Sequence, residues 1–161
     1  MGALIELKNI GYSYHNLAGE TGAIKDVSFQ VEEGEFVALV GPSGCGKSTL
    51  LSIIAGLLAP ETGTIVVNNP DGSLHYPRVG YMLQHDHLFE WRTIYQNVTL
   101  GLEIHHALTK ERTDYVKQLL SDYGLESFQD KRPSELSGGM KQRVGIARAY
   151  ALNPEVLLLD E

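Results

Sequence analysis

The chain has 161 residues, of which 43% are hydrophobic and 20% charged, a composition typical of one folded domain rather than a disordered segment. A formal net charge of −7 argues against a nucleic-acid-binding surface, because phosphate backbones require clustered lysine and arginine. One cysteine, Cys45, excludes an internal disulfide and fits a reducing compartment. No segment approaches the ~20 apolar residues that span a bilayer, so we expect a cytoplasmic protein that contacts a membrane only through a partner.

The beginning of the chain has a strand-like pattern. Alternating apolar and polar residues predict strands at 3–10 and 25–31, separated by a polar, glycine-containing excursion over 15–22. The run at 36–40 is continuously apolar, which predicts a buried parallel strand.

A helix and two further strands are expected next. Residues 47–58 carry apolar side chains at helical spacing, which predicts a helix with one buried face that accommodates Gly56 and ends before Pro60. Short apolar runs predict strands at 64–67 and 79–83.

From Leu88 onward the pattern becomes helical. Thr109 is a suitable cap for a helix that runs through Asp122, with Gly124 as its stop. Another helix begins after Ser137, and residues 156–159 form a last short apolar strand.

The segment between the apolar run and the first helix fits the phosphate-loop pattern G-x-x-x-x-G-K-[ST]. Its glycines let successive N–H groups point at phosphate oxygens, and the following helix adds the positive end of its dipole. Lys47 is expected to reach the β- and γ-phosphates of ATP, Ser48 to coordinate Mg²⁺, and Thr49 to add a donor. The alternative is a glycine-rich turn without a ligand. The candidate nucleotide-binding residues are Gly41, Pro42, Ser43, Gly44, Cys45, Gly46, Lys47, Ser48 and Thr49.

A second candidate anion site lies at the start of the later helix. The segment Leu136–Met140 places a hydroxyl and two glycine amides at a helix N-terminus, those of Ser137, Gly138 and Gly139. An ordinary serine cap beside glycine is the alternative. Because one γ-phosphate does not need two such sites, the pattern suggests a dimer in which each subunit completes its partner's site.

The chain ends on two acidic residues, Asp160 and Glu161, that follow an apolar strand. A parallel strand delivers such carboxylates to the sheet edge at which α/β proteins bind their ligands. The alternative is a solvated acidic strand end.

Four features in this order resemble the ATP-binding subunits of ABC transporters: GPSGCGKST, a glutamine after a strand, LSGGM-KQR and VLLLDE. The helix LSGGMKQRVGIARAY and the upstream Phe-Glu-Trp-Arg-Thr segment resemble importers of the nitrate, sulfonate and taurine group in particular. The resemblance covers essentially the whole chain. It implies an α/β fold, a P-loop NTPase core with a mixed sheet around the Walker A helix, plus an inserted α-helical subdomain.

The resemblance also implies roles for individual residues. Asp160 corresponds to the carboxylate associated with Mg²⁺, and Glu161 to the residue that orients or deprotonates the attacking water. Gln84 corresponds to the glutamine that touches Mg²⁺ and that water, although a lone glutamine would be interpreted as a surface residue. Tyr14 corresponds to the aromatic residue that stacks on adenine. We choose it over Tyr12, which we expect on the opposite face of the strand.

Partners are implied as well. The region around Phe89–Ile94, especially Phe89, Trp91 and Ile94, resembles the surface that receives a helix of the membrane permease, although internal packing of Trp91 is an open alternative. The subunit is expected to act as a homodimer, or with a paired ATPase subunit, on the inner face of the membrane. The four histidines His85, His87, His105 and His106 lack a supporting constellation and are interpreted as solvated loop residues rather than metal ligands.

We therefore expect a core over residues 1–87, a helical subdomain over 88–152 and a return strand over 153–161. The expected function is the ATP-hydrolysing motor subunit of an ABC-type importer. The alternative is a soluble ABC-type ATPase of DNA repair, translation or cofactor assembly, whereas a P-loop kinase does not explain Leu136–Met140. Because the family continues beyond the catalytic glutamate, we expect a C-terminally truncated chain that binds nucleotide weakly and hydrolyses it negligibly.

Overall fold

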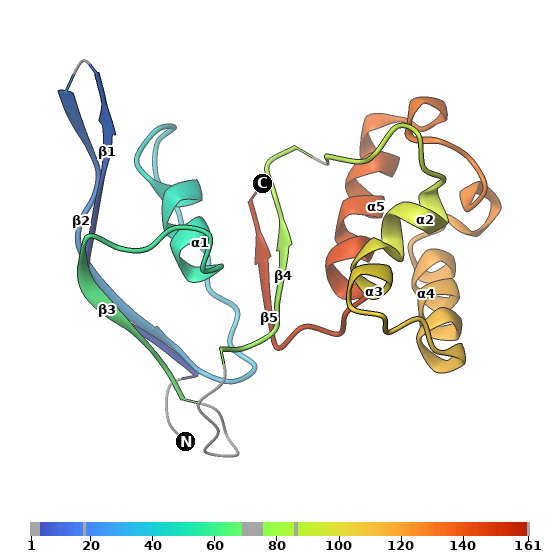
Figure 1. Cartoon of the computed structure of the whole chain (residues 1–161), viewed down its shortest axis with the longest axis horizontal. Helices are drawn as coiled ribbons and strands as arrows, with labels where there is room; N and C mark the ends of the chain where they lie inside the picture. Colours follow the sequence, from blue (N-terminus) through green and yellow to red (C-terminus); the bar gives the residue numbers. More distant parts are fainter. Residues whose placement is uncertain (1–3, 18, 69–75, 86, 161) are drawn as a thin grey trace. The chain divides into compact units, whose positions relative to one another are not determined.

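The computed structural model describes residues 4–17, 19–68, 76–85 and 87–160, and the chain divides into two units, residues 1–77 and 78–161 (Figure 1). The first unit contains a three-stranded antiparallel sheet in the order β2-β1-β3. Its strands are β1 (Ile5–Asn16), β2 (Gly19–Val31) and β3 (Thr62–Val67). Helix α1 (Lys47–Ile54) packs against β2.

The first two strands are longer than the hydrophobic pattern predicts. Residues 15–22, expected as a polar excursion, belong largely to the β1–β2 hairpin, in which His15 pairs with Glu20 and Asn16 with Gly19. A backbone hydrogen-bond ladder does not require apolar side chains, so a strand can continue beyond the end of the hydrophobic alternation. Gly19 has φ +133°, a conformation that permits the tight reversal of the chain.

The predicted buried strand at 36–40 is wrong. These residues have no regular secondary structure, and the side chains of Phe36 and Val40 are 90% and 94% exposed. A strand exists only where a neighbouring strand completes its hydrogen bonds, and no described strand pairs with this run. Apolar composition alone therefore does not make residues 36–40 a strand.

Helix α1 ends earlier than predicted, at Ile54 rather than near Leu58. Gly56 adopts φ +73°, its N–H donates to the Ile53 carbonyl at 3.0 Å, and the Leu57 N–H donates to the Ser52 carbonyl at 2.9 Å. This is the glycine-dependent C-terminal motif of helices, so Gly56 ends the helix instead of lying within it.

The second unit combines a two-stranded parallel sheet with helices. Strands β4 (Val79–Met82) and β5 (Val156–Leu159) pair in register from Val79–Val156 to Met82–Leu159. The helices are α2 (Ile94–Val98), α3 (Leu100–Ile104), α4 (Lys110–Asp122) and α5 (Gly138–Tyr150), with short 3₁₀ turns η1 (Glu126–Phe128) and η2 (Pro133–Glu135). The predicted Thr109 cap, the Gly124 stop and the final strand are confirmed.

The helices of the second unit share one apolar core. Ile94, Val98, Leu120 and Val144, from α2, α4 and α5, are at most 1% exposed. Helix α5 also packs against β4. That approach requires Gly80, because a Cβ at this position would lie 2.5 Å from the Ala149 carbonyl oxygen. Among the described residues, no helix has the length and apolar character needed to cross a membrane.

Candidate functional site

The residues with predicted site roles fall into two groups, one in each unit. In the first unit, the loop 41–46 leads directly into α1, and Gly46 at the helix N-cap has φ +98°. Gly44 is also left-handed, with φ +79°. A Cβ at Gly46 would lie 2.4 Å from the Ala23 carbonyl oxygen, so this position accepts only glycine without a shift of β2. The first N–H groups of α1, which lack acceptors within the helix, begin at this loop.

The side chain of Lys47 closes over the loop. Its Nζ donates to the carbonyl oxygens of Gly41 at 2.8 Å and Pro42 at 3.0 Å, and it lies 3.8 Å from the Cys45 Sγ. The ammonium is therefore held at the loop itself, and a phosphate oxygen that bound there would replace one of these acceptors.

Tyr14 lies beside the end of the loop. Its hydroxyl is 3.1 Å from the Thr49 Oγ1, while Thr49 itself is buried and Ser48 is exposed. The expectation that Tyr12 faces the opposite side is wrong, because residues two apart share one face of a strand and the two tyrosine rings meet edge to face at 5.1 Å. The Tyr14 side chain is 45% exposed, which leaves part of its ring accessible.

In the second unit, Gln84 and Asp160 follow neighbouring parallel strands. Met82 and Leu159 are register partners, and the Asp160 N–H donates to the Met82 carbonyl at 3.0 Å. Gln84 is exposed and comes two residues after the end of β4, whereas Asp160 is 7% exposed. Both side chains thus belong to the carboxyl end of this small sheet. Glu161 lies outside the described residues.

Ser137, Gly138 and Gly139 form the start of α5. The Ser137 Oγ accepts from the Met140 N–H at 3.4 Å, as expected of an N-cap. All three residues are exposed, and a Cβ added at either glycine would meet no atom within 4 Å. This helix end is therefore exposed at its surface.

The Glu135 carboxylate fixes the turn that precedes this helix. One oxygen accepts from the Arg132 N–H at 2.8 Å, and the other lies 3.2 Å from the Lys131 Nζ. These two groups, the backbone N–H first, hold the pKa of Glu135 below its usual 4.5.

A pH titration should reveal this role of Glu135. Because its pKa is lower in the folded than in the unfolded chain, the carboxylate stabilises the turn above about pH 4.5 and loses that contribution as the pH falls through the folded pKa. We expect NMR titration of the full chain to give a Glu135 pKa below 4.5, and Lys131→Met to raise it only in part, since the Arg132 N–H remains. A pKa at or above 4.5 in the unmodified chain would contradict this role.

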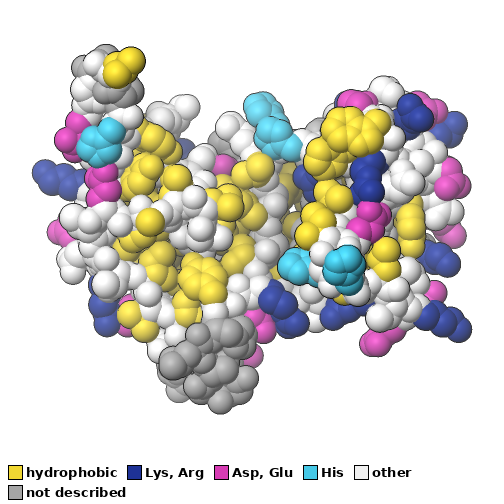
Figure 2. Space-filling view, in the orientation of Figure 1, with side chains coloured by type: hydrophobic (Ala, Val, Ile, Leu, Met, Phe, Trp, Pro, Cys, Tyr) yellow, Lys and Arg dark blue, Asp and Glu magenta, His cyan; other side chains and the backbone are white. Residues whose placement is uncertain are grey.

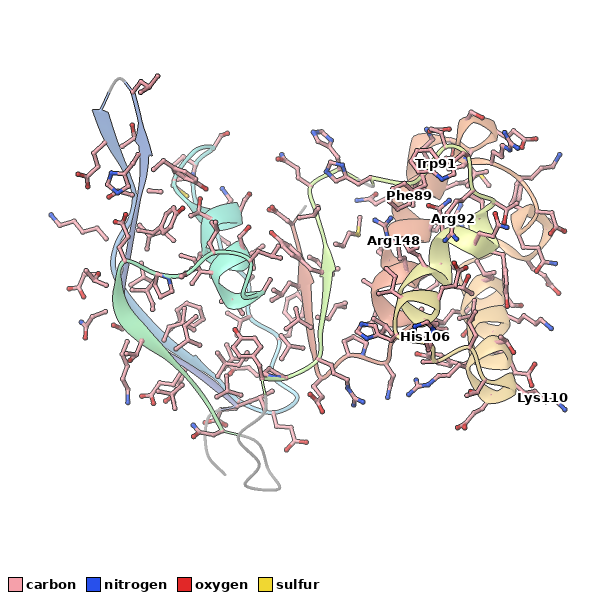
Figure 3. All side chains as sticks on the ribbon, viewed as in Figure 1. Phe89, Trp91, Arg92, His106, Lys110 and Arg148 are labelled. Carbon is pink, nitrogen blue, oxygen red and sulfur yellow. The ribbon has the colours of Figure 1, made fainter. Side chains whose placement is uncertain are left out.

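An exposed aromatic pair marks the segment before α2. The rings of Phe89 and Trp91 lie 4.8 Å apart, and Trp91 is 71% exposed, so it does not pack internally (Figure 3). Figure 2 shows hydrophobic surface over the same end of the second unit. Ile94, expected to share this surface, is wholly buried in the helical core instead, because it begins α2 on its inward face.

Sequence reasoning missed the residue that shapes this segment. Asn97, fully buried on α2, accepts from the Phe89 N–H at 2.8 Å through its Oδ1. Its Nδ2 donates to the carbonyl oxygens of Phe89, Arg92 and Thr93 at 3.1, 3.3 and 2.9 Å. One amide side chain thus holds the whole turn that displays Phe89 and Trp91. An asparagine inside an otherwise apolar helix face was the available signal.

Comparison with known proteins gives a consistent result. Residues 24–161 match the profile of the ABC transporter family. The chain is 43% identical over 159 residues to YtlC of Bacillus subtilis, an uncharacterized ABC transporter ATP-binding protein, covering 99% of this chain and 61% of that one. It is 44% identical to the nitrate import ATP-binding protein NrtD of Synechocystis, covering 98% of this chain and 59% of NrtD.

Among solved structures, the chain resembles a dimeric ATP-binding cassette in a post-hydrolysis state bound to ADP and Pi. The TM-score is 0.84 at 35% identity, covering 98% of this chain and 73% of that chain. The chain spans about three fifths of the length of the two curated relatives named above. On the strength of the family match and these relatives, the chain belongs to the ABC transporter family, among its ATP-binding proteins.

Proposed function

We propose that this chain is the nucleotide-binding part of an ATPase subunit that energises an ABC-type importer. The observation that carries the proposal is the loop 41–46 with Lys47 held over it at the start of α1. Exposed backbone, a fixed ammonium and a helix N-terminus together form a site for the phosphates of ATP. Tyr14, next to Thr49 and partly exposed, is the adenine-stacking residue in this proposal.

The assigned roles follow from the chemistry of each side chain. Lys47 neutralises charge on the β- and γ-phosphates, and Ser137, Gly138 and Gly139 bind the nucleotide held by a partner subunit. Ser48, Gln84 and Asp160 offer hydroxyl, amide and carboxylate oxygens, the ligand types that Mg²⁺ takes. Mg²⁺ bound there would neutralise phosphate charge. Glu161 is assigned to orienting the attacking water, with Gln84 assisting, so that the water approaches the γ-phosphorus in line with the departing ADP.

The exposed aromatic pair supports a membrane partner. Phe89 and Trp91 project from the proposed helical subdomain, residues 88–152, and a permease helix would cover them. We propose a dimer of such subunits, peripheral on the inner face of the membrane, that closes on ATP and reopens after hydrolysis. Two relatives favour an oxyanion importer over a soluble ABC-type ATPase: NrtD, and the sulfate/thiosulfate import ATP-binding protein CysA of Synechocystis, which is 48% identical to this chain over 149 residues. A permease gene beside the gene for this chain would discriminate between the two.

Nucleotide binding is the direct test. We expect Lys47→Ala in the full chain to weaken ATP affinity at least about tenfold, because the ammonium no longer pairs with phosphate oxygens. The affinity is measured by isothermal titration calorimetry with Mg²⁺ and ATP. Lys8→Ala serves as the matched control, since Lys8 is an exposed lysine of β1 paired with Glu6. Equal ATP affinities for the two variants would remove the phosphate-site assignment.

A further inference from the structure

A cluster of potential metal ligands lies near the tip of the β1–β2 hairpin, where it includes the residue that follows Tyr14 but none of the residues given a role above. His15 of β1 and Glu20 of β2 are register partners, and Glu61 comes directly before β3. One ligand atom from each of the three side chains lies within 4.8 Å of the other two. Figure 2 shows a histidine beside acidic side chains over this hairpin.

The backbone holds Glu61 in place for this arrangement. Its N–H donates to the Gly11 carbonyl at 2.9 Å, and one carboxylate oxygen accepts from the Ser13 N–H at 3.0 Å. The other oxygen lies 2.6 Å from the His15 Nε2. Glu61 is thereby fixed against β1, and it in turn orients the imidazole, as outer contacts orient ligands in metal sites.

The surroundings leave room for an ion. All three residues are exposed, and Glu20 and Glu61 also line an open hollow of about 480 Å³ together with Tyr12, Lys25 and Asp26. The hydrogen bond with Glu61, together with the charges of Glu61 and Glu20, raises the pKa of His15. Two carboxylates around one imidazole create a negative site that a dication would neutralise.

We propose that His15, Glu20 and Glu61 bind a divalent transition-metal ion of the Zn²⁺ class. One imidazole nitrogen with two carboxylate oxygens is a donor set suited to Zn²⁺, whereas Mg²⁺ and Ca²⁺ prefer oxygen alone. Tetrahedral bonds of about 2.0–2.1 Å place donor atoms roughly 3.4 Å apart. Side-chain rotations bring the donor atoms to this spacing: Glu20 moves inward, and the 2.6 Å contact between His15 and Glu61 widens. Solvent fills the fourth position.

This site is separate from the Mg²⁺ that accompanies ATP. It uses no residue of the segment 41–49, and it takes a nitrogen donor that Mg²⁺ rarely accepts. Its existence does not depend on nucleotide binding.

Zinc titration of the nucleotide-free full chain tests the proposal. After treatment with a chelator and dialysis, ZnCl₂ is titrated by calorimetry at about pH 8, because protons compete with the metal for the imidazole and a higher pH favours coordination. We expect one site of micromolar affinity that is weakened at least tenfold by Glu20→Gln and by Glu61→Gln. Glu20→Gln leaves the His15–Glu61 hydrogen bond in place, so a loss in that variant does not arise from an opened hairpin.

Matched controls separate this cluster from four of the other five histidines. The double variants His85→Ala/His87→Ala and His105→Ala/His106→Ala should retain the affinity, and zinc should shift the imidazole NMR signals of His15 before those of any other histidine. Absence of binding at millimolar zinc, an affinity unchanged by Glu20→Gln, or loss of binding in either double variant would overturn the proposal.

Discussion

Replacing Asn97 with leucine is expected to lower the free energy of unfolding of the full chain by about 3–5 kcal/mol. Leucine has a similar volume, so no cavity forms, but the Phe89 N–H loses its acceptor and the Arg92 carbonyl loses the Asn97 donor, while the carbonyl oxygens of Phe89 and Thr93 keep only their backbone donors at 3.0 and 2.9 Å. Each buried backbone group left without a partner costs about 1–3 kcal/mol. Urea unfolding followed by far-UV circular dichroism measures the change.

Gln118→Leu is the matched control for this variant. Gln118 is an exposed amide on α4 whose Nε2 donates to the Asp122 Oδ1 at 2.7 Å. Its replacement should change stability by no more than about 0.5 kcal/mol. If the two leucine variants unfold at the same urea concentration, Asn97 does not hold the 89–93 turn in the way the hydrogen bonds indicate.

Gly46→Ala is expected to destabilise the chain by at least about 3 kcal/mol and to reduce ATP affinity at least about 100-fold. The φ of +98° is strained for alanine, and the new Cβ would lie 2.4 Å from the Ala23 carbonyl oxygen of β2. Relief requires the loop to move away from β2, which displaces Lys47 and the first turn of α1. Urea unfolding and ATP titration report the two effects.

Gly44→Ala separates the cost of an unfavourable backbone conformation from the cost of a steric clash. Gly44 also has a positive φ, +79°, but a Cβ there meets nothing within 4 Å. The expected loss of stability is therefore only about 1–2 kcal/mol, the conformational cost alone. Equal unfolding free energies for the two variants would show that the contact with Ala23 is not what makes Gly46 necessary.

Features encoded locally were predicted well from the sequence. Helix α4 starts at Thr109 and stops at Gly124 because a cap and a left-handed glycine act over a few residues. The phosphate loop is a contiguous pattern, so its position before α1 followed directly from the sequence. Gly56 carries the same local signal, because a left-handed glycine also ends α1, but the sequence pattern predicts that the helix continues past it.

Features that depend on distant segments were not predicted. The run at 36–40 is apolar but lacks a strand partner among the described residues, and no sequence window contains that information. His15 and Glu61 are 46 residues apart, and only the pairing of β1 with β3 places them together. The hydrogen bonds of Asn97 likewise depend on a turn whose backbone path cannot be read from composition.

The exposure of Trp91 has a practical consequence, because it is the only tryptophan in the chain. The tryptophan fluorescence of this protein originates in one indole on the proposed permease-facing surface, with no second indole to obscure it. A blue shift and protection from acrylamide quenching would follow the covering of that indole directly, without a label. Nucleotide binding at the loop 41–46 would be visible in this signal only to the extent that it alters the aromatic segment itself.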